Sequence, residues 1–362
     1  MIKKRISWLL LIAATCFLVS ANAGAGLYGS KSKSAKPVKS AKSVKPAKSA
    51  KSNKSGQGRL LMSIDFEPNV PLKYKFVSER KVSLDLDPSG KHSKGGKVSG
   101  SAQQISEKLE MDIVYKPVAV DPYGYSTIEA QCTSAKVSRS SSTGRTQNKK
   151  DAVEYLAGKT FTLKITPTGK IVDYSSLAAV IKELGEKAFS DSTRARVKDP
   201  DMIMDFTAMQ WNIWDAAASI KKPLKGLKRG QKWESKLVAP MPFVSKIGRD
   251  VLYKFDGFVE CGNASCAEIT STYSLSDPNT PPEVTMPYKG SFQMRGTFGF
   301  LTGYQVLSIE GTGSQIYDIK RGLIKSDTQQ YQAKVKASIF GLGSENLEPN
   351  IIVNQTITMT LE

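Results

Sequence analysis

The fold class is decided by residues 161–171, which read FTLKITPTGKI. Between Phe161 and Ile165, apolar and polar residues alternate as they do in a β-strand with one buried face. Pro167 fixes its own φ and Gly169 can adopt a positive φ, so these residues are typical of a tight turn. A strand that leads directly into a tight turn predicts antiparallel pairing with the strand that follows.

The same alternation recurs along the chain and extends this hairpin to a sheet. Four further segments show it: 72–76, 82–87, 251–259 and 353–361. A second hairpin turn is expected at Pro88–Gly90. We therefore predict one α+β domain over residues 58–362. Its large antiparallel sheet is curved and half-barrel-like, is packed on two helices, and is preceded by a disordered segment.

Two segments show the helical period instead. The first begins near Ser176, a candidate N-cap, and runs to about Phe189. The second covers roughly Pro200–Ile220, and its apolar stripe falls at alternating steps of four and three. That stripe consists of Met202, Phe206, Met209, Ile213 and Ala216, broadened by Trp211 and Trp214. We interpret the second helix as packing on the concave face of the sheet. The alternative is that its Met and Trp residues line an apolar ligand cavity.

The first residues have the pattern of a secretory signal peptide. A positive cluster at Lys3–Arg5 precedes an apolar run at Trp8–Val19, and Ala21–Ala23 has small residues where a signal peptidase reads them. We expect residues 1–23 to be removed after Ala23, and no later segment is long and apolar enough to cross a membrane. The predicted location is therefore the periplasm, the cell surface or the medium.

Residues 24–57 are rich in Lys, Ser, Ala and Pro, and they cannot form a core. The formal net charge of the chain is +19, and residues before 55 carry twelve of these charges, which leaves +7 for the rest. Lysine recurs at every third position: Lys33, Lys36, Lys39, Lys42, Lys45, Lys48, Lys51 and Lys54. A regular row of lysines predicts contact with anionic envelope polymers or lipids through counterion release. A solvated spacer is an equal alternative. Because residues 31–54 contain no aromatic side chain on which a base could stack, specific nucleic-acid recognition is not expected.

Three cysteines follow the predicted leader. Cys261 and Cys266 flank a four-residue turn between two strand-like segments, and we predict a disulfide between them. Spacing alone leaves Cys132 open as a partner instead. The spacing matches neither a redox C-x-x-C pair nor a zinc site.

The sequence contains few candidates for catalytic residues. His92 is the one histidine and lies in a glycine- and lysine-rich loop, which is a poor place to orient a base. Gly90 and Gly95 have the spacing of a phosphate-binding loop, but glycine stands where its lysine should be. The pairs Asp85–Asp87 and Asp65–Glu67 are spaced to share a strand face, and we interpret them as solvated. No catalytic residue, cofactor or metal is predicted.

Three sets of turn glycines and strand aromatics follow one another in the second half of the chain. They are Gly158-Lys159-x-Phe161 before Thr166–Ile171, Pro223-x-x-Gly226 before Gly230-x-x-Trp233, and Gly311-x-Gly313-x-x-x-Tyr317-Asp318 before Gly322-x-x-x-Ser326. Over Leu156–Glu362 this order resembles an uncharacterised domain-of-unknown-function family of exported bacterial proteins, found in planctomycetes and bacteroidetes. The resemblance implies a secreted β-rich domain without assigned chemistry. The pattern is also similar in architecture to the half-barrel of periplasmic lipoprotein carriers, which by itself implies no function.

These features favour an exported, non-enzymatic envelope protein that binds an apolar ligand or a protein partner. For that function we expect an elongated apolar cavity between the sheet and the helices. Two alternatives remain. One is a carboxylate-dependent hydrolase that acts on envelope glycans, and the other is a structural component of a surface or matrix.

Overall fold

The structure is a computed structural model. It describes residues 58–88, 103–142, 150–190, 202–241, 247–262, 264–280, 301–339 and 348–362, with the backbone alone for 185–190 and 301–302. The described residues belong to one unit that extends from Lys54 to Glu362.

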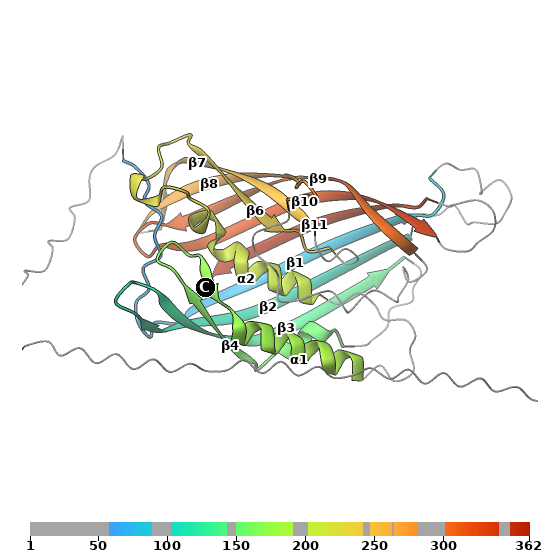
Figure 1. Ribbon diagram of the computed structural model, residues 1–362, viewed down its shortest axis with the longest axis horizontal. Coiled ribbons are helices and arrows are strands. Elements are labelled where there is room, and N and C mark those ends of the chain that lie inside the picture. Colours follow the sequence, from blue (N-terminus) through green and yellow to red (C-terminus); the bar gives the residue numbers. More distant parts are fainter. Residues whose placement is uncertain are drawn as a thin grey trace, which may run out of the picture. The chain divides into compact units, whose positions relative to one another are not determined.

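Eleven strands form a single antiparallel sheet (Figure 1). The strands are β1 (Leu72–Asp85), β2 (Gln103–Val120), β3 (Ser126–Ser141), β4 (Thr160–Ile165), β5 (Ile171–Asp173), β6 (Lys232–Val238), β7 (Gly248–Cys261), β8 (Ala264–Leu275), β9 (Leu301–Asp318), β10 (Leu323–Ile339) and β11 (Asn350–Leu361). Two α-helices, α1 (Ser175–Ser190) and α2 (Ile203–Ala218), connect β5 to β6. Two 3₁₀ helices, η2 (Ala152–Leu156) and η3 (Pro223–Lys225), lie in the connections.

The chain enters the sheet in its middle and leaves it there. From β1 it winds outward to β5, crosses by way of the helices to β6, and winds back to β11, which pairs with β1. The edges of the sheet are β5 and β6, so the sheet curves without closing. The predicted α+β class and the large curved antiparallel sheet are confirmed.

The decisive hairpin forms as the sequence predicts. Phe161, Leu163 and Ile165 point into the core, and the polar residues between them lie on the other face. Thr166 N–H donates to the carbonyl of Lys170 at 2.9 Å, and Gly169 has a φ of +91°. The second predicted turn, Pro88–Gly90, extends beyond the described residues.

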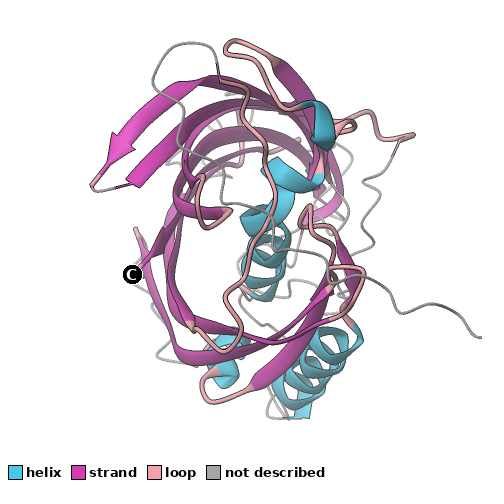
Figure 2. Cartoon of the chain, turned by 90° about the vertical axis from the view of Figure 1, so that its left-hand side faces the viewer, coloured by secondary structure: helices cyan, strands magenta, loops and turns pink. Residues whose placement is uncertain are grey.

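The helix α2 lies inside the curve of the sheet, whereas α1 lies outside it (Figure 2). Of the 16 residues of α2, 14 are buried, so the sheet encloses the helix on nearly every side. This exceeds the prediction of a helix resting on one face. In α1, Asp173 Oδ1 accepts the Ser175 N–H, and Ser176 Oγ accepts the Thr162 N–H of β4. Ser176 therefore joins the helix to the sheet and is not its N-cap.

One end of the half-barrel is crossed by residues 58–71, which we call the crossing segment (blue in Figure 1). Leu60 exchanges two backbone hydrogen bonds with Leu227, and Ile64 N–H donates to the carbonyl of Pro167. Tyr317 donates its hydroxyl to the Ser63 carbonyl at 2.8 Å. Gly322 lies so close to this segment that a Cβ there would come within 2.0 Å of the Ser63 oxygen. Tyr317 and Gly322, which both belong to the motifs that resemble those of the exported family, thus hold the crossing segment in place.

Cys261 and Cys266 form the predicted disulfide across the β7–β8 hairpin, with their Cα atoms 5.9 Å apart. Cys132 is free and buried on β3. Burial raises the pKa of its thiol to about 12, so the thiol stays protonated and unreactive at neutral pH. The alternative pairing through Cys132 is excluded.

Candidate functional site

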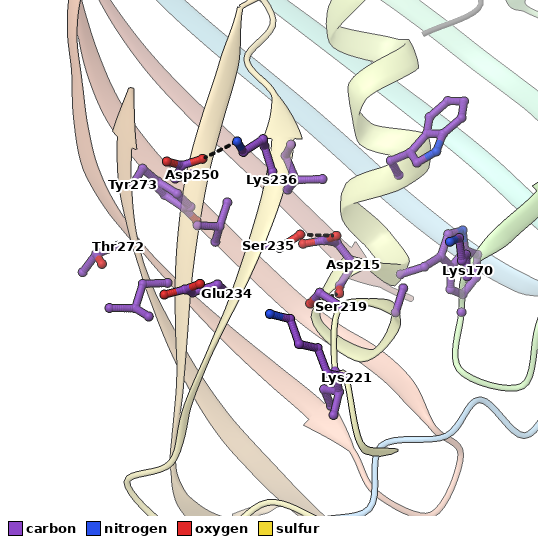
Figure 3. Close-up of a pocket in the computed structure, with 18 of the residues that line it drawn as sticks. Lys170, Asp215, Ser219, Lys221, Glu234, Ser235, Lys236, Asp250, Thr272 and Tyr273 are labelled. Atoms are coloured by element: carbon purple, nitrogen blue, oxygen red, sulfur yellow. Dashed lines mark hydrogen bonds and ion pairs between the residues drawn. The ribbon is translucent and has the colours of Figure 1, made fainter. Parts of the chain in front are cut away.

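A cavity of about 890 Å³, the main cavity, opens between the two edges of the sheet. Its walls come from the β4–β5 turn, the C-terminal half of α2, and strands β6, β7 and β8 (Figure 3). The prediction of an elongated apolar cavity between the sheet and the helices is confirmed in part: α2 lines the cavity and α1 does not, and polar side chains share the wall with apolar ones. Elsewhere α2 is in contact with the sheet, and the predicted Met stripe is core: Met202, Met209 and Ile213 are all buried.

Apolar side chains cover much of the wall of the main cavity. Trp211 and Trp214 contribute from α2, and these are the two residues that extend beyond the predicted Met stripe. Further apolar lining comes from Ile171, Ile220, Leu237 and Val251. Within the described residues, the buried Trp214 Nε1 has no hydrogen-bond partner. A wall of this kind suits a hydrocarbon or a ring system.

The first half of α2 is fixed by a buried ionic network. Arg80 on β1 donates from Nη1 to Asp205 Oδ2 at 3.1 Å, and from Nη2 to Glu107 Oε2 at 2.6 Å. Ser78 and Gln355 also donate to Asp205. Burial acts to raise the pKa of Glu107, but the attraction of Arg80 and Arg139 outweighs it and lowers that pKa. This network sets the position of the helix relative to the centre of the sheet.

The second half of α2 is fixed at the main cavity itself. Asp215 accepts from Tyr253 Oη at 2.7 Å and from Ser235 Oγ at 2.8 Å, and Figure 3 shows Asp215 and Ser235 facing each other. Trp233 Nε1 donates to the carbonyl of Ala216 at 3.0 Å. Burial raises the pKa of Asp215, and the two donated hydrogen bonds offset this only in part. The cavity wall therefore holds a carboxyl group whose charge is disfavoured.

The rim of the main cavity is basic. Residues 220–232, the basic loop, join α2 to β6 and contain six cations and no acid: Lys221, Lys222, Lys225, Lys228, Arg229 and Lys232. In the part of the chain that the structure describes, none of the six forms a salt bridge with an acidic side chain. A second cavity of about 490 Å³, the rim cavity, is lined by Arg59 and four of these lysines, with Glu234 as its one acid. Because Ile220 and Lys221 line both cavities, an apolar wall continues into a cationic rim.

The sequence did not predict this site, although it carried a signal for it. A net charge of +7 over the rest of the chain predicts a mildly basic body, whereas a count of charges over short windows finds the basic loop. The predicted polycationic residues Lys33 to Lys54, the cleavage site at Ala23, and His92 all lie outside the described residues. Asp85 ends β1 half-buried and accepts the Asp87 N–H, whereas Asp87 is buried, so the interpretation of this pair as solvated is wrong for Asp87. Asp65 and Glu67 are exposed on the crossing segment, as predicted. None of these four acids lines the main cavity.

Within the described residues, no three acidic, cysteine or histidine side chains are grouped as a metal site would require. In the same part of the chain, no helix combines the length and apolar character needed to cross a membrane.

Comparison with known proteins gives distant structural similarities. No protein-family model matches the chain, and no curated protein matches it in sequence. A structure of lipovitellin, solved to describe its lipid–protein interactions, has a TM-score of 0.42 and 11% identity; the match covers 82% of this chain and 25% of lipovitellin. An outer-membrane channel from Pseudomonas putida F1 has a TM-score of 0.18 and 7% identity, over 83% of this chain and 98% of that one. The similarity to the uncharacterised exported family stays a prediction, and these structural likenesses identify no function.

Proposed function

We propose that this chain is an exported, non-enzymatic binding protein of the cell envelope, and that its half-barrel takes up an acidic amphiphile. The observation that carries the proposal is the continuity of an apolar wall, at Trp211, Trp214 and Leu237, with the cationic rim at Lys221 and Lys222. An amphiphile matches both surfaces because its hydrocarbon part leaves water and its acidic group meets ammonium groups.

The volume supports the same class of ligand. Ligand sites in proteins usually occupy about 300–1,000 Å³, and the main cavity lies within this range. Burial raises the pKa of Asp215, so the negative charge that would oppose an acidic ligand is less favoured there than on an exposed carboxyl group. Lys236 pairs with Asp250 at 3.7 Å, which leaves Lys221 and Lys222, the loop lysines nearest the apolar wall, to meet the acidic group.

The hydrolase alternative has less support. Three acids line the main cavity: Asp215, Glu234 and Asp250. Asp215 is held by two donated hydrogen bonds, and Asp250 accepts from Ser276 Oγ and pairs with Lys236, so both have structural partners. Glu234 is exposed at the rim. We keep the hydrolase as an outcome to test by incubation with envelope glycans, where release of a reducing end would support it.

The apolar wall is tested by Ile171→Asp. Ile171 lines the main cavity and is half-buried, whereas its neighbour Val172 is exposed and lines neither cavity. We expect Ile171→Asp to weaken the binding of monomeric dodecyl phosphate by about tenfold or more, because an apolar contact is replaced by a charge. Isothermal titration calorimetry measures the dissociation constant, and Val172→Asp is the matched control. Equal affinities for both variants would exclude this wall as the binding surface.

The rim is tested by Lys221→Glu against Lys228→Glu. Both lysines belong to the basic loop, but only Lys221 lines the cavities. Lys221→Glu should weaken dodecyl phosphate binding about fivefold and leave uncharged dodecanol unaffected, because the change acts on the acidic group alone. Lys228→Glu should change the affinity for neither dodecyl phosphate nor dodecanol. A wild-type protein that binds both probes equally would contradict acidic-group recognition.

The lysine-rich segment is proposed as a second contact, with anionic polymers or lipids of the envelope. Deleting residues 31–55 removes the lysines at every third position. We expect the deletion to abolish salt-sensitive retention on isolated envelope fractions, because that retention depends on counterion release. Retention that is unchanged and insensitive to salt would show that the segment is a spacer.

A further inference from the structure

Exposed apolar side chains gather at the end of the half-barrel that the crossing segment closes. In the described residues nine large apolar side chains are exposed, and seven belong to segments that meet there: Leu61, Val70, Val118, Val120, Tyr123, Leu224 and Phe258. Backbone contacts join these segments, since Asn69 N–H donates to the Pro117 carbonyl and Leu60 pairs with Leu227. Scattered exposed apolar residues need no explanation, but a cluster at one end indicates an interaction surface.

The most exposed of these residues sits within the basic loop. Leu224 in η3 is 95% exposed, and Lys222 and Lys225 lie on either side of it in the sequence. Leu61, 55% exposed, lies beside Gly226 of the same loop. An apolar tip surrounded by cations is the arrangement with which peripheral proteins enter the interface of an anionic bilayer.

The tip is held in place by the rest of the domain. Arg59 Nη1 donates to the Lys225 carbonyl at 2.6 Å, and Leu60 pairs with Leu227 on the other side of Gly226. Arg229 Nε donates to the carbonyl of Asp256 at 2.7 Å. Leu224 is therefore presented to solvent by an anchored loop, and the loop that presents it also forms the rim of both cavities.

We propose that the basic loop docks this end of the domain onto an anionic lipid bilayer, with Leu224 entering the headgroup region. The inference deepens the proposed function, because it places the cavity rim at the surface from which an acidic amphiphile would come. A bilayer explains the apolar tip and the cations together, whereas a soluble polyanion would explain the cations alone.

Insertion is measured at Leu224 itself. Cys132 is buried and the other two cysteines of the domain are paired, so Leu224→Cys adds one accessible thiol to the form that begins at Gly24. A nitrobenzoxadiazole label on this thiol should shift to the blue and brighten with phosphatidylglycerol vesicles, and stay unchanged with phosphatidylcholine vesicles. Leu307→Cys, on β9 and also exposed, is the matched control and should not respond. Equal responses at both labels, or none at Leu224, would overturn the proposal.

Three unlabelled variants separate docking from ligand uptake. Leu224→Ser and Lys228→Glu should each weaken vesicle binding at least about fivefold, measured by co-sedimentation, and leave monomeric dodecyl phosphate binding intact. Ile171→Asp should weaken dodecyl phosphate binding and leave vesicle binding intact. The lysine-rich segment is the same in all three proteins, so its contribution cancels. If Leu224→Ser binds vesicles as the wild type does and Lys228→Glu does not, the loop is attracted by charge alone and the proposed insertion of Leu224 is wrong.

Discussion

Replacing Arg80 with methionine is expected to lower the free energy of unfolding by about 3–5 kcal/mol, because it leaves buried charge without its partner. Arg80 is fully buried between Glu107 and Asp205. Glu107 keeps a second cation, Arg139, at 2.8 Å. Asp205 keeps the hydroxyl and amide donors of its site but no cation, and it therefore accounts for most of the loss.

Lys108→Met is the matched control for this change. Lys108 lies on β2, 3.3 Å from Glu79 and 3.2 Å from Glu110, and its side chain is 39% exposed. Exposed pairs of this kind contribute about 0–1 kcal/mol. Urea unfolding measures both variants, and adding Asp205→Asn to Arg80→Met should recover part of the loss. Similar losses for the two single variants would mean that the buried network does not fix α2.

Replacing Asp327 with asparagine is expected to raise stability at pH 8 and to leave it nearly unchanged at pH 4. Asp327 on β10 is buried and accepts from Gln329 Nε2, while its Oδ1 has no hydrogen-bond partner among the described residues. Arg249, also buried, donates to Gln329 at 2.5 Å, so it reaches the carboxyl group through the amide and not directly. Burial raises the pKa of Asp327 from 3.8 to about 7.

The sign of the pH dependence follows from this pKa. The folded protein holds the proton to higher pH than the unfolded chain does, so folding is favoured most below the unfolded pKa. That stability is lost as the pH rises through the folded value of about 7. A shift of this size corresponds to roughly 4 kcal/mol between pH 4 and pH 8, at about 1.4 kcal/mol for each pKa unit. Asparagine carries no such cost and keeps an acceptor for Gln329.

Urea unfolding at a series of pH values checks this result. The wild type should lose stability from pH 4 to pH 8, and Asp327→Asn should remove most of that slope. Asp256→Asn is the control: burial acts to raise the pKa of Asp256, but Lys254 and Thr270 outweigh it and lower that pKa. Asp256→Asn should therefore lower stability by a constant amount above about pH 5 and keep the wild-type slope there, and the difference from the wild type should shrink only as the pH falls below about 4. A wild-type slope that survives Asp327→Asn would show that Asp327 is ionised in the folded protein at neutral pH.

The hairpin at 161–171 was predictable because everything that specifies it is local. Alternation assigns one face of each strand, and Gly169 with Pro167 supplies the turn. The pairing of β1 with β11 was not predictable, since it joins residues such as Val82 and Val353 that only the complete fold brings together. No local rule states that the chain enters a sheet in its middle.

The buried polar residues were not predictable from the sequence for a related reason. On α2, Asp205 and Asn212 fall outside the apolar stripe and would read as a solvated face, yet both are buried. Likewise Asp327 and Gln329 alternate along β10 on the inner face of the sheet. Alternation separates two faces but does not say which face is enclosed, and the partners that make burial tolerable lie far away in the sequence. Asp205 and Ser78, for example, are 127 residues apart.

The main cavity was likewise predictable only where local sequence specifies it. Trp211 and Trp214 were recognisable as an apolar excess on one helix, and both line the main cavity. Their opposite wall comes from β6 and β7, whose position depends on the crossing from β5 to β6. The cationic rim needed a local charge count, which the whole-chain total concealed.

Native mass spectrometry of the protein isolated from the cells that make it tests the central claim most directly. We expect wild-type protein to retain a small acidic amphiphile as a discrete added mass, and Ile171→Asp to lose it while Val172→Asp keeps it. Wild-type protein that carries no added mass, and that also fails to bind dodecyl phosphate when it is supplied, would contradict the assignment of the main cavity as a ligand site.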